Sequence, residues 1–229
     1  MTPGPQAIIF DFDGVIANTE PLHFEAFRRV LAGVPIALGK SVYAEKYMGL
    51  SDRVMLRTVL ADSGRSGAEP QLETLLRHKQ AAYLAMIAGG HPLLPGVEHL
   101  IRCVTRDRLL AICSGARRVE IDTILAPHGL LTHFPVIVSA DDVTTSKPDP
   151  AGFLLTLNRL RQARGNLTAD ACLVIEDSVP GLTAARAAGM RTLAVRPRRG
   201  PADPLPADAT VPDLTHVDDA LLAAVCPTE

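Results

Sequence analysis

Two aspartates, one residue apart, follow a short apolar run near the start of the chain. Residues 7–10 read Ala-Ile-Ile-Phe, which is typical of a strand buried on both faces. Asp11 and Asp13 come directly after this run, and Gly14 ends the pattern. Open α/β sheets bind ligands at the carboxyl ends of their strands, so we expect both carboxylates at such an edge. Neighbouring anions repel unless a cation or a shared proton relieves them. The pair therefore indicates a metal or acid/base site, with an ordinary polar strand end as the alternative.

Polar groups also follow other apolar runs further along the chain. They are a hydroxyl followed by glycine, a lysine in a loop, and a second carboxylate pair: Ser114-Gly115, Lys147 and Glu176-Asp177. Strands that alternate with helices predict a parallel sheet, in which the carboxyl ends of the strands meet at one edge. The sequence therefore predicts that all these groups gather near Asp11 and Asp13.

Phosphoryl transfer has a use for every group in this set. Mg²⁺ prefers a few carboxylates and retains several waters, so the acidic groups suit it better than Zn²⁺ or Ca²⁺. One carboxylate can attack phosphorus to give an aspartyl phosphate, and a second can exchange protons with the leaving oxygen and with water. Ser114, the N–H of Gly115 and Lys147 can stabilise charge on the phosphoryl oxygens. Arginine far outnumbers lysine in this chain, so Lys147 hints at a need for a compact ammonium; a surface lysine is the alternative.

The composition favours a soluble α/β protein without a broad basic surface. The 229 residues suffice for a core domain with a smaller insertion, and 47% of them are apolar. A formal charge of −2 argues against nucleic acid as the main partner. The sequence shows neither a secretory signal pattern nor an apolar run of membrane-spanning length. We expect a cytoplasmic monomer that acts on a small molecule and has neither nucleic acid nor membrane as a partner.

The cysteines indicate neither a disulfide framework nor a zinc site. They are scattered and form no CxxC pair: Cys103, Cys113, Cys172 and Cys226. Cys113 and Cys172 lie in or beside apolar runs, which favours buried free thiols. No GxGxxG or Walker sequence supports a nucleotide cofactor.

The stretch from 17 to 90 contains helical patterns and no strand pattern. Its helices are predicted at three places: from Thr19 to Gly33, at about 51–64 and at about 71–88. We expect this stretch, 17–90, to be a helical cap domain inserted into a core domain made of residues 1–16 and 91–229.

Apolar runs alternate with amphipathic segments after residue 91. Strands are predicted at 109–113, 135–139, 171–175, 192–195 and near 210–211. Helices are predicted at 97–104, 117–126, 150–160, 180–188 and 217–225. This alternation favours a parallel sheet with right-handed crossovers. A basic run at 196–199 is expected to form a solvated loop.

These motifs resemble those of the haloacid dehalogenase (HAD) superfamily, in the branch (subfamily IA) with a helical cap after the first strand. The motifs that carry the resemblance are Asp11-Phe12-Asp13-Gly14-Val15-Ile16, Ser114-Gly115, Ser146-Lys147-Pro148-Asp149-Pro150 and Ile175-Glu176-Asp177-Ser178. The resemblance extends to about Val195. It implies an α/β fold with a doubly wound parallel, Rossmann-like sheet core and an inserted cap.

The resemblance also implies roles for the residues. Asp11 would be the nucleophile and Asp13 the general acid/base, with Ser114 and Lys147 completing the catalytic set. The implied Mg²⁺ ligands are Asp11, the backbone carbonyl of Asp13, Asp177, and Glu176 directly or through water. Dehalogenases lack the second aspartate of the first motif, so its presence here favours phosphate esters over carbon–halogen substrates.

Within the superfamily, the chain is similar to β-phosphoglucomutase and to sugar-phosphate phosphatases with the same type of cap. The cap differs from that of the mutase: Asp52 stands where the mutase has arginine, and Arg53 comes one position later. One residue along a helix turns a side chain by about 100°, so we expect the contact with a second phosphate to be altered or lost. The predicted substrate-binding residues are Thr19, His23, Arg53, Lys79, Gly115 and Arg117. For His23, a half-exposed helix histidine is the alternative.

Three functions stay open at this point. The leading hypothesis is a Mg²⁺-dependent phosphatase that hydrolyses a small phosphomonoester, a sugar phosphate, through an aspartyl phosphate. The second is an isomerase like β-phosphoglucomutase, which moves the phosphoryl group within a sugar phosphate. The third is a phospho-accepting receiver module, which would lack the insertion of about 70 residues after the first strand.

Overall fold

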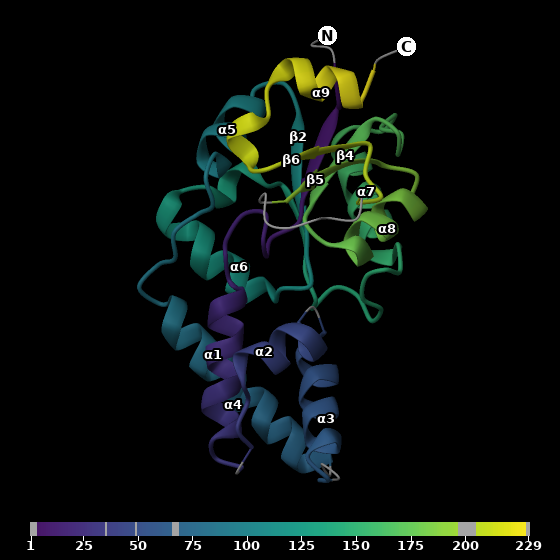
Figure 1. Ribbon diagram of the computed structural model, residues 1–229. Helices are drawn as coiled ribbons and strands as arrows, with labels where there is room; N and C mark the ends of the chain where they lie inside the picture. The colour runs from purple at the N-terminus through teal and green to yellow at the C-terminus, as the bar shows by residue number, and fades with distance from the viewer. Residues whose placement is uncertain (1–3, 35, 49, 66–68, 197–204, 228–229) are drawn as a thin grey trace. The chain divides into compact units, whose positions relative to one another are not determined.

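The computed structural model describes residues 4–34, 36–48, 50–65, 69–196 and 205–227 (Figure 1). The chain forms two compact units: one comprises Met1–Asn18 and His91–Glu229, and the other is Thr19–Gly90. Whether the second unit acts as a cap stays a prediction. The basic run at 196–199 lies, apart from Arg196, outside the described residues.

The larger unit contains a six-stranded parallel sheet with the order β3-β2-β1-β4-β5-β6. Its strands are β1 (Ala7–Phe10), β2 (Leu109–Cys113), β3 (Val136–Val138), β4 (Cys172–Glu176), β5 (Arg191–Val195) and β6 (Ala209–Val211). The four inner strands β2, β1, β4 and β5 are mostly apolar and almost entirely buried, as expected of strands covered on both faces. The predicted doubly wound parallel sheet is confirmed.

Helices cover both faces of this sheet (Figure 1). They are α5 (Val97–Val104), α6 (Arg118–Leu125), α7 (Ala151–Ala163), α8 (Val179–Ala187) and α9 (Asp219–Val225). Side chains alternate along a strand, so Ile9 and Val174 point to the same face, where they join a cluster that includes Phe153 of α7 and Ala184 of α8. Phe10 points to the other face and meets Phe134 edge to face.

The strand order fixes where a ligand site can form. From β1 the chain builds β2 and β3 on one side and then crosses to β4 on the other side. The carboxyl edge between β1 and β4 is therefore the point where the order reverses, which is where open α/β sheets bind ligands. Phe10 pairs with Ile112 of β2 and Ile175 of β4. Asp11 follows Phe10, and Glu176 follows Ile175. Both residues therefore lie at the carboxyl edge where the strand order reverses.

A short seam closes the larger unit at the two places where the chain leaves and re-enters it. Ala17 and Leu93 form an isolated antiparallel bridge, and Leu94 N donates to Ile16 O at 2.9 Å. His91 Nε2 lies 3.0 Å from the carbonyl oxygen of Asn18. The segments on either side of the insertion therefore lie next to each other.

The smaller unit is helical in its described part. Its elements are α1 (Glu20–Leu31), α2 (Lys40–Val42), a π-helical turn η1 (Tyr43–Tyr47), α3 (Asp52–Asp62) and α4 (Glu69–Ile87). Its core is made by large apolar residues that include Phe27, Leu31, Met55, Leu56 and Leu72. The three long helices match the predicted positions, whereas α2 and η1 lack a long apolar stripe and were not predicted.

Local differences from the sequence predictions concern helix ends. Thr19 stands at the N-cap position of α1, but its side chain makes no capping hydrogen bond. Pro150, expected to begin α7, is instead its N-cap residue, while Asp149 Oδ1 accepts from Ala151 N at 2.8 Å. All four cysteines are free thiols, as predicted, and three of them are buried.

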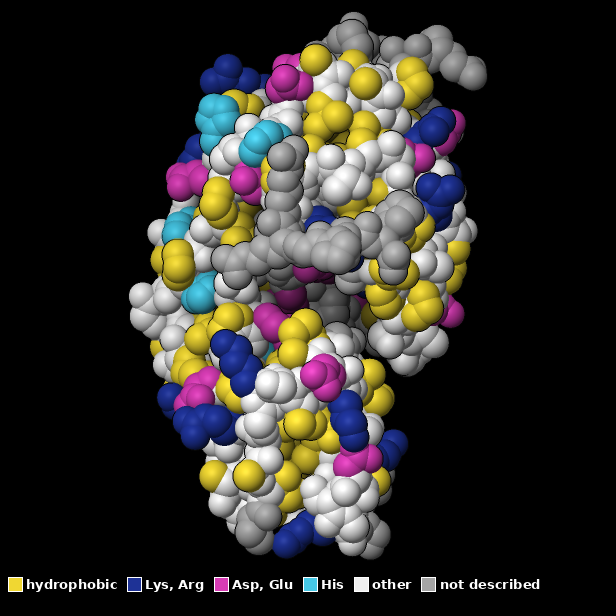
Figure 2. All heavy atoms as spheres, in the orientation of Figure 1, with side chains coloured by type: hydrophobic (Ala, Val, Ile, Leu, Met, Phe, Trp, Pro, Cys, Tyr) yellow, Lys and Arg dark blue, Asp and Glu magenta, His cyan; other side chains and the backbone are white. Residues whose placement is uncertain are grey.

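Among the described residues on the face in view, no single kind of charge is concentrated (Figure 2). Acidic and basic side chains are interspersed there, in keeping with the formal charge of −2. In the described part of the chain, no helix is both long and apolar enough to cross a membrane.

Candidate active site

A tight turn after β1 holds the first carboxylate pair. Asp11 N donates to Ile175 O at 2.9 Å, which ties the end of β1 to β4. The turn is closed by Gly14 N, which donates to Ala17 O at 2.9 Å. Gly14 has a φ of +79°, and a Cβ there would overlap the carboxylate of Asp177. Only glycine can therefore occupy this position without moving Asp177.

The ammonium of Lys147 joins two of the strand ends. Its Nζ donates to Asp11 Oδ1 at 2.6 Å and to Glu176 Oε1 at 2.8 Å. All three side chains are largely buried, with 19%, 8% and 2% of Lys147, Asp11 and Glu176 exposed. Burial alone would lower the pKa of Lys147, but the charges of the two carboxylates hold it well above its usual value. Lys147 is therefore a fixed cation at the predicted edge.

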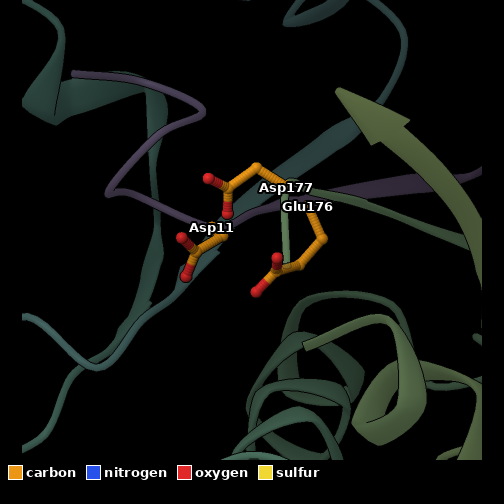
Figure 3. A group of neighbouring side chains, drawn as sticks. All are labelled: Asp11, Glu176 and Asp177. Carbon is orange, nitrogen blue, oxygen red and sulfur yellow. The ribbon is translucent and has the colours of Figure 1, made fainter. Parts of the chain in front are cut away.

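Three carboxylates, those of Asp11, Glu176 and Asp177, converge at this edge (Figure 3). Asp11, Glu176 and Asp177 each offer an oxygen, and these oxygens lie within 4.8 Å of one another. Burial, together with the charges of Glu176 and Asp13, raises the pKa of Asp11 although Lys147 opposes the shift. Desolvation and the charges of Asp11 and Glu176 also raise the pKa of Asp177. The cluster thus has more negative charge than Lys147 balances, and an all-oxygen set of this kind fits Mg²⁺.

Glu176 is held from two sides. Its Oε1 accepts from Lys147, and its Oε2 accepts from the backbone N–H of Ser178 at 2.6 Å. Gly181, in the first turn of α8, faces the same side chain, and a Cβ there would overlap the Glu176 carboxylate. Ser178 Oγ in turn accepts from Gly181 N at 3.1 Å, so the start of α8 is fixed against the site.

Replacing Gly181 by alanine tests this packing. Alanine is favoured over glycine in a helix by about 1 kcal/mol, yet here its methyl group must displace Glu176. We expect Gly181→Ala to lower the catalytic rate by about 10–100-fold, because the partner of Lys147 moves. Gly165→Ala is the matched control, since a Cβ there meets open space. Equal rates in the two variants would contradict the role of Gly181.

Ser114 and Gly115 follow the strand next to β1. Ser114 is buried, its N–H donates to Val138 O at 3.0 Å, and its Oγ accepts from Ala116 N at 3.1 Å. Gly115 is exposed, and a Cβ there would meet nothing within 4 Å. Register places both residues at the same edge as Asp11, where a hydroxyl hydrogen and a backbone N–H can meet an anion.

Arg117 is engaged by an acidic partner that the sequence did not indicate. Its Nε donates to Asp141 Oδ1 at 3.1 Å, and Arg118 N donates to Asp141 Oδ2 at 3.0 Å. The Arg117 side chain is 47% exposed. Asp141 therefore holds the predicted substrate-binding arginine at the start of α6.

The predicted residues of the helical unit are brought together only in part. His23 and Lys79 are in contact, while Arg53 pairs with Glu73 on α4. Thr19 is buried, and its carbonyl accepts from His23 N at 3.0 Å. Asp52, for which the sequence offered no role, forms an ion pair with Lys79.

The parallel α/β sheet and the carboxylates gathered around Lys147 at the point where the strand order reverses mark this edge as the candidate active site. The haloacid dehalogenase-like hydrolase family matches residues 8–195. The chain belongs to this family, and the predicted hydrolase class is confirmed.

Several relatives span most of the chain. A "phosphorylated carbohydrates phosphatase" of Thermotoga maritima is 30% identical over 82% of this chain and 83% of its own length. "Fructose-1-phosphate phosphatase YqaB" of Escherichia coli is 31% identical over 82% of this chain and 95% of its own. The crystal structure of β-phosphoglucomutase from Clostridium difficile superposes with a TM-score of 0.82 at 25% identity, covering 96% of each chain. The two relatives named as phosphatases, together with the family, support assignment to the phosphomonoester hydrolases.

Proposed function

We propose that this protein is a Mg²⁺-dependent phosphatase that hydrolyses a small phosphomonoester, a sugar phosphate, through an aspartyl phosphate on Asp11. The observation that carries the proposal is the buried ammonium of Lys147 between Asp11 and Glu176, at the point where the strand order reverses. Names of the relatives support the substrate class, since two of them are phosphatases of phosphorylated sugars.

The reaction divides into two displacements at phosphorus. An Asp11 oxygen forms the new P–O bond while the bond to the leaving alcohol breaks, and Asp13 gives its proton to that alcohol oxygen. Asp13 then takes a proton from water, whose oxygen attacks phosphorus and releases the Asp11 carboxylate and inorganic phosphate. Lys147, the Ser114 hydroxyl and the Gly115 N–H stabilise the negative charge on the phosphoryl oxygens.

The acidic cluster is the proposed site of the metal ion. Mg²⁺ would be held by Asp11, the Asp13 backbone carbonyl, Asp177, and Glu176 directly or through water, and would add positive charge beside the phosphoryl oxygens.

The helical unit, in this proposal, acts as the cap that excludes bulk water and recognises the rest of the substrate. Thr19, His23, Arg53 and Lys79 remain its proposed contributors, together with Arg117 of the larger unit. The substrate is a small phosphorylated metabolite. The cytoplasmic localisation and the monomeric state of the protein stay predictions.

Phosphate release from a panel of phosphorylated metabolites tests the function. The panel contains sugar monophosphates, sugar bisphosphates and p-nitrophenyl phosphate, each with Mg²⁺ and with EDTA. We expect release from at least one sugar monophosphate with Mg²⁺ and none with EDTA. Absence of release from every ester, or full activity in EDTA, would reject the proposal.

Asp13→Asn tests the proton-transfer role. A general acid matters most when the leaving oxygen is basic, so we expect loss of about 10²–10³-fold for sugar phosphates and much less for p-nitrophenyl phosphate. The comparison uses kcat for both ester types in the same variant. Equal loss for both would show that Asp13 acts on structure or metal binding instead of protonating the leaving group.

The alternative function is an isomerase, which the structural similarity to β-phosphoglucomutase favours. In that reaction the aspartyl phosphate passes its phosphoryl group to a second hydroxyl of a sugar phosphate. Measuring glucose 6-phosphate formed from β-glucose 1-phosphate, against free phosphate, separates the two functions. Phosphate in excess supports the phosphatase.

A further inference from the structure

A buried lysine joins three helices of the smaller unit. Lys79 of α4 has a side chain that is 0% exposed. Its Nζ lies 2.7 Å from both carboxylate oxygens of Asp52, at the start of α3, and 2.8 Å from Nδ1 of His23 on α1. The rings of Phe27 and Tyr83 lie 4.8 Å and 5.2 Å from the same nitrogen. An ammonium has three hydrogens, and these three oxygen and nitrogen acceptors can engage all of them.

His23 adds no positive charge to this group. Burial, followed by the charge of Lys79, lowers the pKa of His23 to about 3. Because its Nδ1 accepts from Lys79, the neutral ring carries its hydrogen on Nε2. The ring also stacks on Tyr83 with a centroid separation of 4.3 Å, which fixes its orientation.

The charged group of this cluster that reaches solvent is an anion. The Asp52 side chain is 36% exposed, whereas Lys79 is fully covered. The neighbouring cation, Arg53, forms a salt bridge with Glu73. The two cations of this unit that were predicted to bind substrate, Lys79 and Arg53, are thus each paired with a carboxylate of the same unit.

A carboxylate and a phosphate have opposite preferences for a ligand. A carboxylate accepts hydrogen bonds from hydroxyl groups and repels another anion. A phosphate group instead needs donors and positive charge. The exposed face of the Lys79–Asp52 pair therefore suits the hydroxyl groups of a sugar better than a second phosphate.

We propose that Asp52 determines specificity, so that the helical unit selects the uncharged, hydroxyl-bearing part of a sugar monophosphate and discriminates against bisphosphates. This inference rests on the proposed function and narrows its substrate class. It also weighs against the isomerase, because moving the phosphoryl group to a second hydroxyl of a sugar phosphate passes through a bisphosphate.

The test is a ratio of kcat/KM values for matched esters. The probes are fructose 1-phosphate with fructose 1,6-bisphosphate, and β-glucose 1-phosphate with glucose 1,6-bisphosphate, assayed by phosphate release. For the wild type we expect kcat/KM for each bisphosphate to be at least tenfold lower than for the matching monophosphate. Asp52→Asn should reduce the ratio of monophosphate to bisphosphate kcat/KM by tenfold or more, because the charge of Lys79 is then no longer neutralised. The ester without sugar hydroxyls is p-nitrophenyl phosphate, and its kcat/KM should change less than the ratio for the sugar esters.

Two further variants keep the test decisive. Asp52→Asn leaves a buried ammonium without its anion and can fail to fold, so Asp52→Asn/Lys79→Met removes both charges. This double variant should reduce the ratio of monophosphate to bisphosphate kcat/KM by about threefold, which is less than the reduction in Asp52→Asn. Asp62→Asn is the control, since Asp62 lies at the other end of α3 and accepts from Tyr47.

Each outcome has a defined meaning. A wild type that prefers bisphosphates, or a ratio unmoved in both Asp52 variants, overturns the specificity role while the proposed function stands. The same shift in Asp62→Asn also overturns it. A wild type that is inactive on every ester rejects the proposed function itself.

Discussion

Asp11→Asn is expected to lower phosphate release by about 10⁴-fold or more. The variant removes the attacking oxygen and its charge but keeps the size of the side chain. Its neighbour Lys147 retains Glu176 as a partner, so the fold should be maintained. The measurement is Mg²⁺-dependent phosphate release, with circular dichroism to compare the folded state.

Two observations make the Asp11 experiment specific to nucleophilic attack. Rapid quenching of the wild type during turnover should give an aspartyl phosphate, detected by mass on the peptide that contains Asp11 and absent in the variant. Asp122→Asn, which removes an exposed carboxylate that pairs with Arg118, should keep wild-type activity. Retention of more than about a tenth of the activity in Asp11→Asn would reject the assignment.

Lys147→Met is expected to reduce both activity and stability. Removing one group that stabilises transition-state charge typically costs about 10²–10³-fold, and we expect the upper end here. Removal of one partner of a buried ion pair costs about 3–5 kcal/mol in unfolding free energy, because Asp11 and Glu176 are left facing each other.

The pH dependence of the Lys147 variant has a definite sign. Without the ammonium, the pKa of Asp11 rises further above its value in the unfolded chain. The folded state then binds more protons than the unfolded state, so stability falls as the pH rises. In urea unfolding without added metal, the loss of unfolding free energy in Lys147→Met relative to the wild type should be larger at pH 8 than at pH 5. Lys46→Met removes an exposed lysine and is the control, with little change at either pH. A deficit that grows toward low pH would contradict the argument.

The strand ends of the larger unit could be predicted because local pattern and topology agree. Each apolar run is buried, and in a parallel sheet the residues after such runs must meet at one edge. Lys147 could be placed there as well, since its loop follows the predicted strand at 135–139. Sequence patterns were therefore sufficient to predict the acidic cluster and its neighbouring lysine.

Partners chosen by side-chain geometry could not be predicted in the same way. Asp52 and Lys79 are 27 residues apart and on different helices, and no periodicity links them. Asp141 reaches Arg117 from a loop, and Gly181 matters only because Glu176 fills the space beside it. Such pairings depend on how helices pack, which amphipathic patterns constrain only loosely.

The contacts of Ala17 with Leu93 and of Asn18 with His91 bring the two ends of the helical insert together. The chain exits and returns at adjoining residues, so a shortened connection from 18 to 91 would leave the strand hydrogen bonds of the sheet in place. The helical inserts of other family members could be joined to the sheet domain at the same residues. If the helical unit recognises the substrate as proposed, chimaeras of this kind should exchange selectivity between enzymes while each host retains its own acidic edge and lysine.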